Sequence, residues 1–422
     1  MTHSPPPFVT SMTCLVCGTP YEHGDLLTCE HCGQDGILDL EYDYGGIAEA
    51  LARKPLSRQP MNLWRYVDLL PVTRDFAPPP LEIGWTPVHE VPRLAKAVGI
   101  RSLFLKDDGR NPTSSFKDRA SAVGVMKAKE FGYESIACAS TGNAASSLAG
   151  LAAASGLQSF IFVPERTPEP KVTQLLIFGA TVFRVRGSYE DAFDLCRASC
   201  EAFGWYSRNG GTNPFLVEGK KTAGLEIGEQ FGRTIPDWVV VSVGDGCTIG
   251  GIGKGLQEMK RLGMIPHVPR LLGVQADGAR PIVDAFLSGK NLIPSRPETI
   301  ADSIAVGTPR NWRRAIAQIR ASHGEMVAVK DEQILEAMRV TARLAGVFGE
   351  PAGVAGLAGL HEALQKGIVR AGESAVIVIT GNGLKDIQTA RRAAGEELCI
   401  EPGLDAVRAA LAHRGNAHEV KQ

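Results

Sequence analysis

Short apolar segments alternate with segments of helical periodicity along most of this 422-residue chain, from about residue 81 onward. The apolar segments are rich in Val and Ile and show little polar alternation, which is typical of strands covered on both faces. They lie at 135–140, 160–164, 181–185, 238–243, 271–275 and 375–380. The helical patterns lie near 116–131, 143–155, 188–203, 218–231, 248–262, 331–345 and 354–367.

This alternation predicts an α/β fold with parallel sheets and right-handed crossovers. The strands fall into two clusters, so we predict two open parallel-sheet subdomains within a catalytic domain at 81–400. The smaller subdomain, about 122–212, is inserted in the larger. Residues 46–80 end in a Pro-rich run that indicates a connector, and 401–422 indicate a C-terminal helix and tail. A ligand then belongs in the cleft between the sheets, at the carboxyl ends of the strands.

Four of the nine cysteines lie within the first 32 residues, as Cys14-Leu-Val-Cys17 and Cys29-Glu-His-Cys32. Two such pairs can surround one tetrahedral zinc ion, so residues 1–45 are predicted to form a small zinc ribbon. Because four thiolates close such a site, the metal would support folding rather than catalysis. The alternative is a ribbon that keeps its cysteines without metal or buries them as apolar side chains.

The composition argues against several classes of partner. The formal net charge of −1 lacks the basic excess of proteins that bind nucleic acids or membrane surfaces. No basic and apolar leader opens the chain and no 18-residue apolar stretch occurs, so neither a signal peptide nor a membrane span is expected. The cysteines number nine, an odd total, and four of them are clustered, which favours a reduced compartment; we expect a cytoplasmic protein.

A lysine stands in the first of several polar clusters that follow strands or open helices. In the segment 111–119, Pro112 and a Ser/Thr run favour a loop and a helix cap, so that Lys117 falls in the first helical turn. A cation is disfavoured at that end of the helix dipole. Lys117 is therefore either solvated, which is the common case for a single lysine, or engaged, for example as a neutral amine that forms an imine.

Two further clusters are suited to anions. In the segment 139–144, free amides at a helix start can bind a carboxylate and Asn143 can bond a phenolic oxygen, although an ordinary helix cap reads the same. In the segment 243–251, Gly244 and Gly246 let the backbone fold around a phosphate, with amides and Thr248 as donors. This segment is neither a P-loop nor a G-x-G-x-x-G motif. Asp245 is acidic, and its side chain has to face away from a phosphate.

The last apolar strand is followed by Thr380, whose hydroxyl can meet a pyridine nitrogen and would leave that nitrogen unprotonated. A lysine, a phosphate cradle, a carboxylate cradle and a hydroxyl together fit a pyridoxal 5′-phosphate site. The combination carries more weight than any one of its members.

Residues 81–394 resemble the threonine synthases, which belong to the tryptophan-synthase-β-like (fold type II) family of pyridoxal phosphate enzymes. The matching stretches occur in the family's order, at 82–87, 111–119, 140–143, 218–222, 243–251, 273–275 and 380–386. The four-cysteine segment is also similar to that of some shorter threonine synthases and of cysteate synthases.

The resemblance implies a lyase acting on a small amino-acid substrate, as a homodimer, and a role for each matched residue. Lys117 would hold the cofactor as a Schiff base and move protons along the substrate. Asn143 would bond the phenolic oxygen, Thr380 would meet the ring nitrogen, and Lys171 would contact the substrate's phosphate. The cofactor's phosphate would be held by Gly244, Asp245, Gly246, Cys247 and Thr248. The substrate's carboxylate would be held by Ser140, Thr141, Gly142 and Ala144.

The sequence departs from the family where substrate phosphate is bound. Gly210 and Gly211 stand where similar threonine synthases have Asn-Ser, and Leu216 stands where they have Arg. Losing a bidentate donor should weaken binding of a phosphorylated substrate. Trp85 also replaces the small or amide residue usual before Thr86-Pro87.

Three functions therefore remain open. A threonine synthase would convert O-phospho-L-homoserine and water into L-threonine and phosphate. A β-replacement or β-elimination enzyme would act on a serine, threonine or phosphoserine derivative, in the manner of cysteate synthase or threonine dehydratase. A zinc-dependent binding or regulatory protein would carry an inactive enzyme domain, a reading that Lys117 and the intact cradles argue against.

Overall fold

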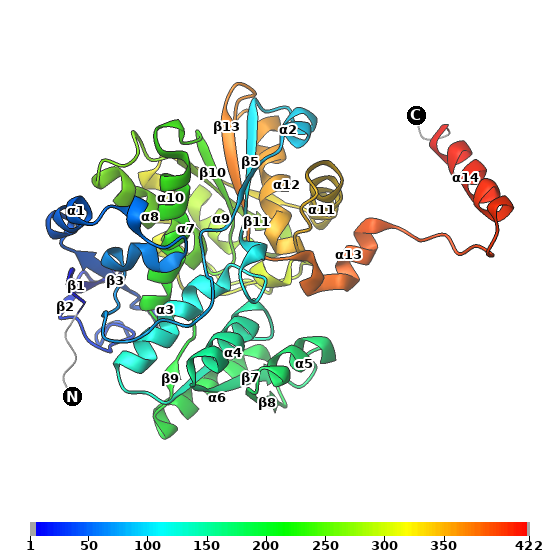
Figure 1. Ribbon diagram of the computed structural model, residues 1–422. Coiled ribbons are helices and arrows are strands. Elements are labelled where there is room, and N and C mark those ends of the chain that lie inside the picture. The colour runs from blue at the N-terminus through cyan, green and yellow to red at the C-terminus, as the bar shows by residue number, and fades with distance from the viewer. Residues whose placement is uncertain (1–5, 420–422) are drawn as a thin grey trace.

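Two open sheets form the framework of the computed structural model, which describes residues 6–419 (Figure 1). The larger sheet has the order β12-β11-β10-β13-β5-β4, and its neighbours are parallel except for the antiparallel edge pair β4 and β5. Its strands are β4 (Val88–Glu90), β5 (Ser102–Asp107), β10 (Trp238–Ser242), β11 (Arg270–Ala276), β12 (Glu325–Val329) and β13 (Ser374–Ile379).

The smaller sheet is parallel throughout and has the order β8-β7-β6-β9. Its strands are β6 (Ser135–Ala139), β7 (Gln158–Pro164), β8 (Thr181–Val185) and β9 (Tyr206–Ser207). The predicted α/β class with two parallel sheets is thus confirmed. The sequence analysis missed four strands of these two sheets. β4 and β9 have only three and two residues, while β5 and β12 carry charged residues, Lys106 and Glu325, within or beside their apolar positions.

Helices cover the sheets, and the predicted helical patterns agree with the observed helices to within a few residues. The helices are α1 (Tyr44–Arg53), α2 (Pro92–Val98), α3 (Lys117–Glu130), α4 (Asn143–Ser155), α5 (Glu169–Ile177), α6 (Tyr189–Phe203), α7 (Phe215–Phe231), α8 (Cys247–Arg261), α9 (Pro281–Ser288), α10 (Trp312–Ala321), α11 (Asp331–Ala345), α12 (Pro351–Gln365), α13 (Ile387–Ala394) and α14 (Leu404–Glu419). Helices α7 and α8 pack closely because of glycine: a Cβ at Gly224 would lie 2.2 Å from the Ile252 carbonyl oxygen.

The N-terminal segment forms a three-stranded antiparallel sheet, β2-β1-β3, from β1 (Val9–Cys14), β2 (Pro20–Tyr21) and β3 (Leu38–Tyr42). Buried ion pairs fasten it to the larger domain. Lys254 on α8 donates to Asp39 Oδ1 at 2.9 Å and to Glu218 Oε1 at 2.8 Å, while Tyr42 donates to Glu218 Oε2 at 2.7 Å. The segment is therefore part of the folded body of the molecule.

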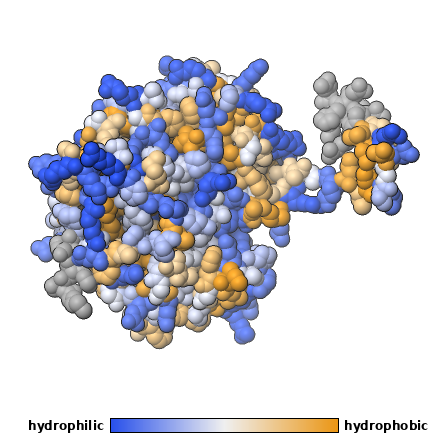
Figure 2. Space-filling view, in the orientation of Figure 1, coloured by the Kyte–Doolittle hydropathy of each residue, from blue (hydrophilic) through white to orange (hydrophobic). Residues whose placement is uncertain are grey.

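Residues 46–80 pack more closely than a connector would. They hold a helical turn at Leu63–Leu69, whose Leu63, Tyr66 and Leu69 are buried. The predicted C-terminal helix is present as α14, which projects away from the body in Figure 1 and exposes apolar residues in Figure 2. The last residues of the predicted tail, 420–422, lie outside the described residues. Within residues 6–419, no helix has the length and apolarity needed to span a membrane.

Candidate active site

A cavity of about 1020 Å³ gathers side chains and loops from both sheets. β10 and β13 are neighbours in the larger sheet and end before Gly244 and Thr380, and β6 of the smaller sheet ends before Ser140. The residues that follow all three strands line this one cavity. Twelve of the predicted site residues line it: Lys117, Ser140, Thr141, Gly142, Asn143, Ala144, Gly244, Asp245, Gly246, Cys247, Thr248 and Thr380. The structure thus brings them together, while their individual roles stay predictions.

Lys117 is the first residue of α3 and is half-buried at the cavity wall. The loop before it is fixed to the end of β13, because the Phe116 amide donates to the Thr380 carbonyl at 2.9 Å and the Asn382 amide donates to the Ser114 carbonyl at 3.0 Å. Burial, followed by repulsion from Lys220, lowers the pKa of Lys117 to about 8. A larger share of its amine is then neutral near pH 7, which is the form that attacks a carbonyl.

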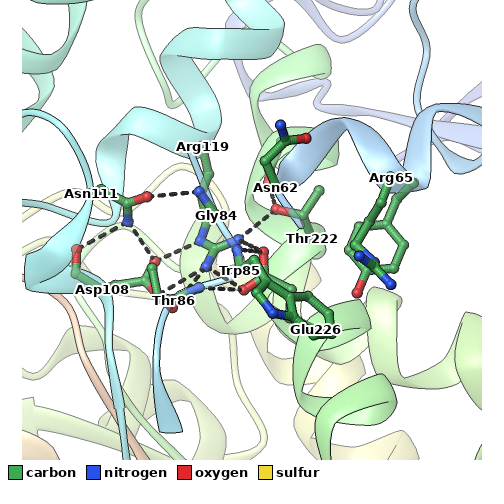
Figure 3. Close-up of polar contacts among 12 residues, drawn as sticks. Asn62, Arg65, Gly84, Trp85, Thr86, Asp108, Asn111, Arg119, Thr222 and Glu226 are labelled. Atoms are coloured by element: carbon green, nitrogen blue, oxygen red, sulfur yellow. Dashed lines mark hydrogen bonds and ion pairs between the residues drawn. The ribbon is translucent and has the colours of Figure 1, made fainter. Parts of the chain in front are cut away.

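A buried network of charged side chains adjoins the loop that precedes Lys117 (Figure 3). Arg119 donates to Asp108 Oδ2 at 2.6 Å and to Glu226 Oε2 at 2.8 Å, and Lys106 donates to Glu226 Oε2 at 2.6 Å. All four side chains are fully buried. Burial alone would raise the pKa of Glu226, but Arg119 and Lys106 outweigh burial and lower that pKa to about 2. Since Arg119 lies two residues after Lys117, the network positions the start of α3.

The same network holds the segment that contains Trp85. Glu226 accepts from the Trp85 amide at 2.7 Å, and a Cβ at Gly84, where φ is +78°, would lie 2.6 Å from Glu226 Oε1. Trp85 itself has a φ of 48°, and Arg65 stacks over its ring at 4.2 Å. Trp85 is absent from the described lining of the cavity, so this departure from the family pattern affects the scaffold rather than the cavity wall.

Asn143 opens α4 and points its amide at a carboxylate that the sequence analysis missed. Asn143 Nδ2 donates to Glu350 Oε1 at 2.7 Å and to Ser303 Oγ at 3.3 Å. Glu350 is buried, and burial raises its pKa. In the sequence Glu350 stands between a glycine and a proline, which indicates only a turn before a helix. No sequence signal connects it to Asn143.

The loop after β10 has the shape expected of an anion cradle. Gly246 has a φ of +96°, and a Cβ there would lie 2.7 Å from the Asn311 carbonyl oxygen, so the turn requires glycine. The Asp245 carboxylate is engaged by its neighbours: it accepts from the Arg310 amide at 2.7 Å and from Asn311 Nδ2 at 3.2 Å. These contacts leave the loop amides at the start of α8 available to an anion.

Lys171 lies beside this cavity rather than on its wall. It lines a smaller adjoining cavity of about 40 Å³, where its ammonium donates to Asp302 Oδ2 at 2.6 Å. Asp302 lines both cavities. The role that the resemblance assigns to Lys171 stays a prediction, and it requires the Asp302 carboxylate to release the ammonium.

The four predicted metal ligands Cys14, Cys17, Cys29 and Cys32 form one cluster at the N-terminal sheet. Their sulfur atoms all lie within 4.8 Å of one another, and the cysteines are free thiols. A tetrahedral site with Zn–S distances of about 2.3 Å places its sulfurs about 3.8 Å apart. Cys17 and Cys29 already have their sulfurs 3.6 Å apart. The donor set therefore fits a zinc ion.

Comparison with known proteins shows similarity over nearly the whole chain. Residues 80–381 match the model of a family described as pyridoxal-phosphate dependent enzyme. The chain is 40% identical to the threonine synthase of Methanocaldococcus jannaschii, over 94% of this chain and 98% of that protein. It is 39% identical to the threonine synthase of Methanosarcina acetivorans, over 95% and 98% respectively. A third relative, the threonine synthase of Mycobacterium bovis, is 39% identical over 77% of this chain and 88% of that protein.

Solved structures with low sequence identity share the fold. Maize serine racemase superimposes with a TM-score of 0.62 at 22% identity, covering 70% of this chain and 89% of that chain. Diaminopropionate ammonia lyase from Escherichia coli gives a TM-score of 0.63 at 19% identity, covering 76% and 88%. These likenesses concern the arrangement of the two sheets and their helices.

Proposed function

The chain belongs to the family of pyridoxal-phosphate dependent enzymes, and on that premise we propose that it is a threonine synthase. It would convert O-phospho-L-homoserine and water into L-threonine and phosphate. The observation that carries the proposal is similarity to two threonine synthases along 94–95% of the chain, a span that extends beyond the catalytic domain. The gathering of Lys117 and the cradles in one cavity supports it.

The cavity residues fit pyridoxal phosphate. Lys117 supplies an amine with a lowered pKa, Gly246 allows the tight turn of a phosphate loop, and Thr380 also lines the cavity. When bound, the cofactor withdraws electrons from the carbon skeleton of an attached amino acid and so acidifies its C–H bonds. Asn143 would bond the phenolic oxygen with one amide hydrogen while the other keeps its contact with Glu350.

The residues of this chain have two tasks in the reaction. The amides and hydroxyls of the Ser140–Ala144 loop, at the start of α4, would bind the substrate's carboxylate and orient the carbon chain. The Lys117 amine would take a proton from the α-carbon and return protons along the substrate, because its lowered pKa suits both acceptance and donation near neutral pH.

A second function is favoured by one observation, the replacement of the family's phosphate ligands at Gly210, Gly211 and Leu216. A β-replacement or β-elimination enzyme that acts on a serine, threonine or phosphoserine derivative has no leaving group at the γ-carbon. Such an enzyme would not need these phosphate ligands.

Activity assays with three candidate substrates distinguish these two functions. We expect the purified enzyme to release phosphate from O-phospho-L-homoserine. It should release little from O-phospho-L-serine with sulfite and form little 2-oxobutyrate from L-threonine. Preference for either of the last two reactions would replace the proposal with the β-chemistry.

We also propose that Cys14, Cys17, Cys29 and Cys32 hold one structural zinc ion. The prediction is about one zinc per chain by elemental analysis, and a Cys14→Ser enzyme whose melting temperature falls while kcat changes little. A metal-free preparation that melts at the wild-type temperature would show that packing alone holds the segment.

The homodimer and the cytoplasmic location implied by the sequence analysis stay predictions.

A further inference from the structure

Arg208 carries a buried guanidinium that forms no ion pair with any residue in the described range 6–419. It follows β9, and its amide continues that strand by donating to the Ala137 carbonyl at 2.8 Å. The side chain is 2% exposed and donates from Nε to Ser121 Oγ at 3.0 Å. Among residues 6–419, no acceptor contacts its Nη2. A buried cation is expensive unless it is paired, so an unpaired one at a cavity wall points to a ligand.

Lys220 is a second such cation. It lies on α7, is 3% exposed, and lines the same cavity. In the part of the chain that the structure describes, its ammonium has neither a hydrogen bond nor an ion pair. The other buried lysines of this region differ, since Lys221 pairs with Glu258 at 2.9 Å.

Gly210 leaves the two cations facing one open position. A Cβ at Gly210 would lie 3.7 Å from Lys220 Nζ and 3.8 Å from Arg208 Nη1, so one group placed there contacts both. The Gly210 carbonyl accepts from Cys247 Sγ at 3.1 Å, which puts this position beside the phosphate loop. Leu216 stands next to Arg208, since both side chains border Gly124 on α3.

Among the described residues, no acidic residue of the cavity wall forms an ion pair with either cation. Asp245 is held by residues 310 and 311, Glu350 accepts from Asn143, and Asp302 pairs with Lys171. Glu190 and Asp194, on α6, are exposed to solvent. Both cations also act on Lys117, whose pKa is lowered by burial first and then by Lys220 and Arg208 among the charged neighbours. The position beside Gly210 therefore has uncompensated positive charge.

We propose that Arg208 and Lys220 form the site for the substrate's phosphate group, and so replace the ligands lost at Gly210, Gly211 and Leu216. This inference rests on the proposed function and names the residues that select its phosphorylated substrate. A phosphate monoester carries about two negative charges near neutral pH, which matches two cations, and the planar guanidinium binds phosphate bidentately. The half-exposed Lys171, already paired with Asp302, is then secondary.

The test uses the cofactor-loaded enzyme and inorganic phosphate as the probe. Phosphate affinity is measured by calorimetry for wild type, Arg208→Gln, Lys220→Gln and the control Arg184→Gln, which removes a cation from the edge strand β8 of the same sheet. We expect each of the first two variants to weaken phosphate binding at least about 30-fold. The control should stay within about twofold, as surface ion pairs contribute little. Phosphate should also raise the melting temperature of wild type more than that of either variant.

Steady-state kinetics with O-phospho-L-homoserine are the second part of the test. For Arg208→Gln and Lys220→Gln, KM for O-phospho-L-homoserine should rise at least about 30-fold at unchanged cofactor content. Binding of unphosphorylated L-homoserine should be unaffected. If Arg208→Gln does not fold, Lys220→Gln alone decides. Variants that bind phosphate normally, or that lose the cofactor instead, would overturn the inference. Phosphate binding that depends on both cations, in an enzyme that does not act on O-phospho-L-homoserine, would support the anion site while rejecting the proposed function.

Discussion

Lys117→Ala is expected to slow release of phosphate from O-phospho-L-homoserine by at least about 10⁴-fold, because in the proposed mechanism Lys117 would both attach the cofactor and transfer protons. The fold should persist, since Lys117 is a half-buried cation beside Lys220 and Arg208 and makes no described ion pair. Removing it relieves repulsion, so the melting temperature of the cofactor-free variant should not fall below that of the cofactor-free wild type. The matched control is Lys129→Ala at the other end of α3, which should leave activity within about twofold.

Chemical labelling provides a second readout for Lys117. Borohydride reduction of the purified enzyme should fix a pyridoxyl group on Lys117, found by peptide mapping, and should remove the visible absorbance. Turnover by Lys117→Ala at the wild-type rate, or a label on another lysine, would reject the assignment.

Glu226→Gln is expected to cost about 3–5 kcal/mol of unfolding free energy. Glu226 compensates two fully buried cations, Arg119 and Lys106, and also accepts from the amides of Trp85 and Thr86. An uncharged amide leaves Lys106 without its ion pair and Arg119 with Asp108 as its only carboxylate partner. Urea unfolding followed by tryptophan fluorescence measures the change. The control is Glu362→Gln, a surface residue paired with Lys366 one helical turn away, for which a loss under about 1 kcal/mol is expected.

The same network predicts a dependence of stability on pH. The folded-state pKa of Glu226 is lowered to about 2, below the value of about 4.3 in an unfolded chain. The stabilisation is therefore present above the unfolded-state pKa and is lost as the pH falls toward 2. As the pH falls from the unfolded-state pKa to the folded-state pKa, the unfolding free energy of Glu226→Gln should decrease less than that of wild type. Equal stability of the two proteins at pH 7 would show that the network does not support the fold as described.

The sequence was sufficient to predict the framework and the main cavity loops. Strands β6, β10 and β13 are short and apolar, and each is followed by polar or glycine residues. Parallel strands place their carboxyl ends on one edge of a sheet, so the loops after β10 and β13 were expected to meet at the larger sheet. The loop after β6 was expected to meet them across the cleft between the two sheets. Lys117 was predicted from its own segment, in which a Ser/Thr-rich loop precedes a helix.

The rest depends on pairings that a sequence does not display. Lys106 on β5 looks like a surface residue, and its partner Glu226 lies 120 residues away. Glu350 meets Asn143 across 207 residues, and Lys171 meets Asp302 across 131. Arg208 shows no signal in the sequence for a different reason: its distinguishing feature is a buried guanidinium that lacks an ion pair, and whose Nη2 lacks an acceptor, among residues 6–419.

The measurement that tests the account most directly is turnover of O-phospho-L-homoserine in ¹⁸O-labelled water, with both products analysed by mass spectrometry. A threonine synthase breaks the bond between carbon and oxygen and adds water at the β-carbon. We therefore predict one ¹⁸O atom in the hydroxyl group of L-threonine and none in the phosphate released. Label in the phosphate, together with L-homoserine as the product, would identify simple phosphate hydrolysis and contradict the proposed function.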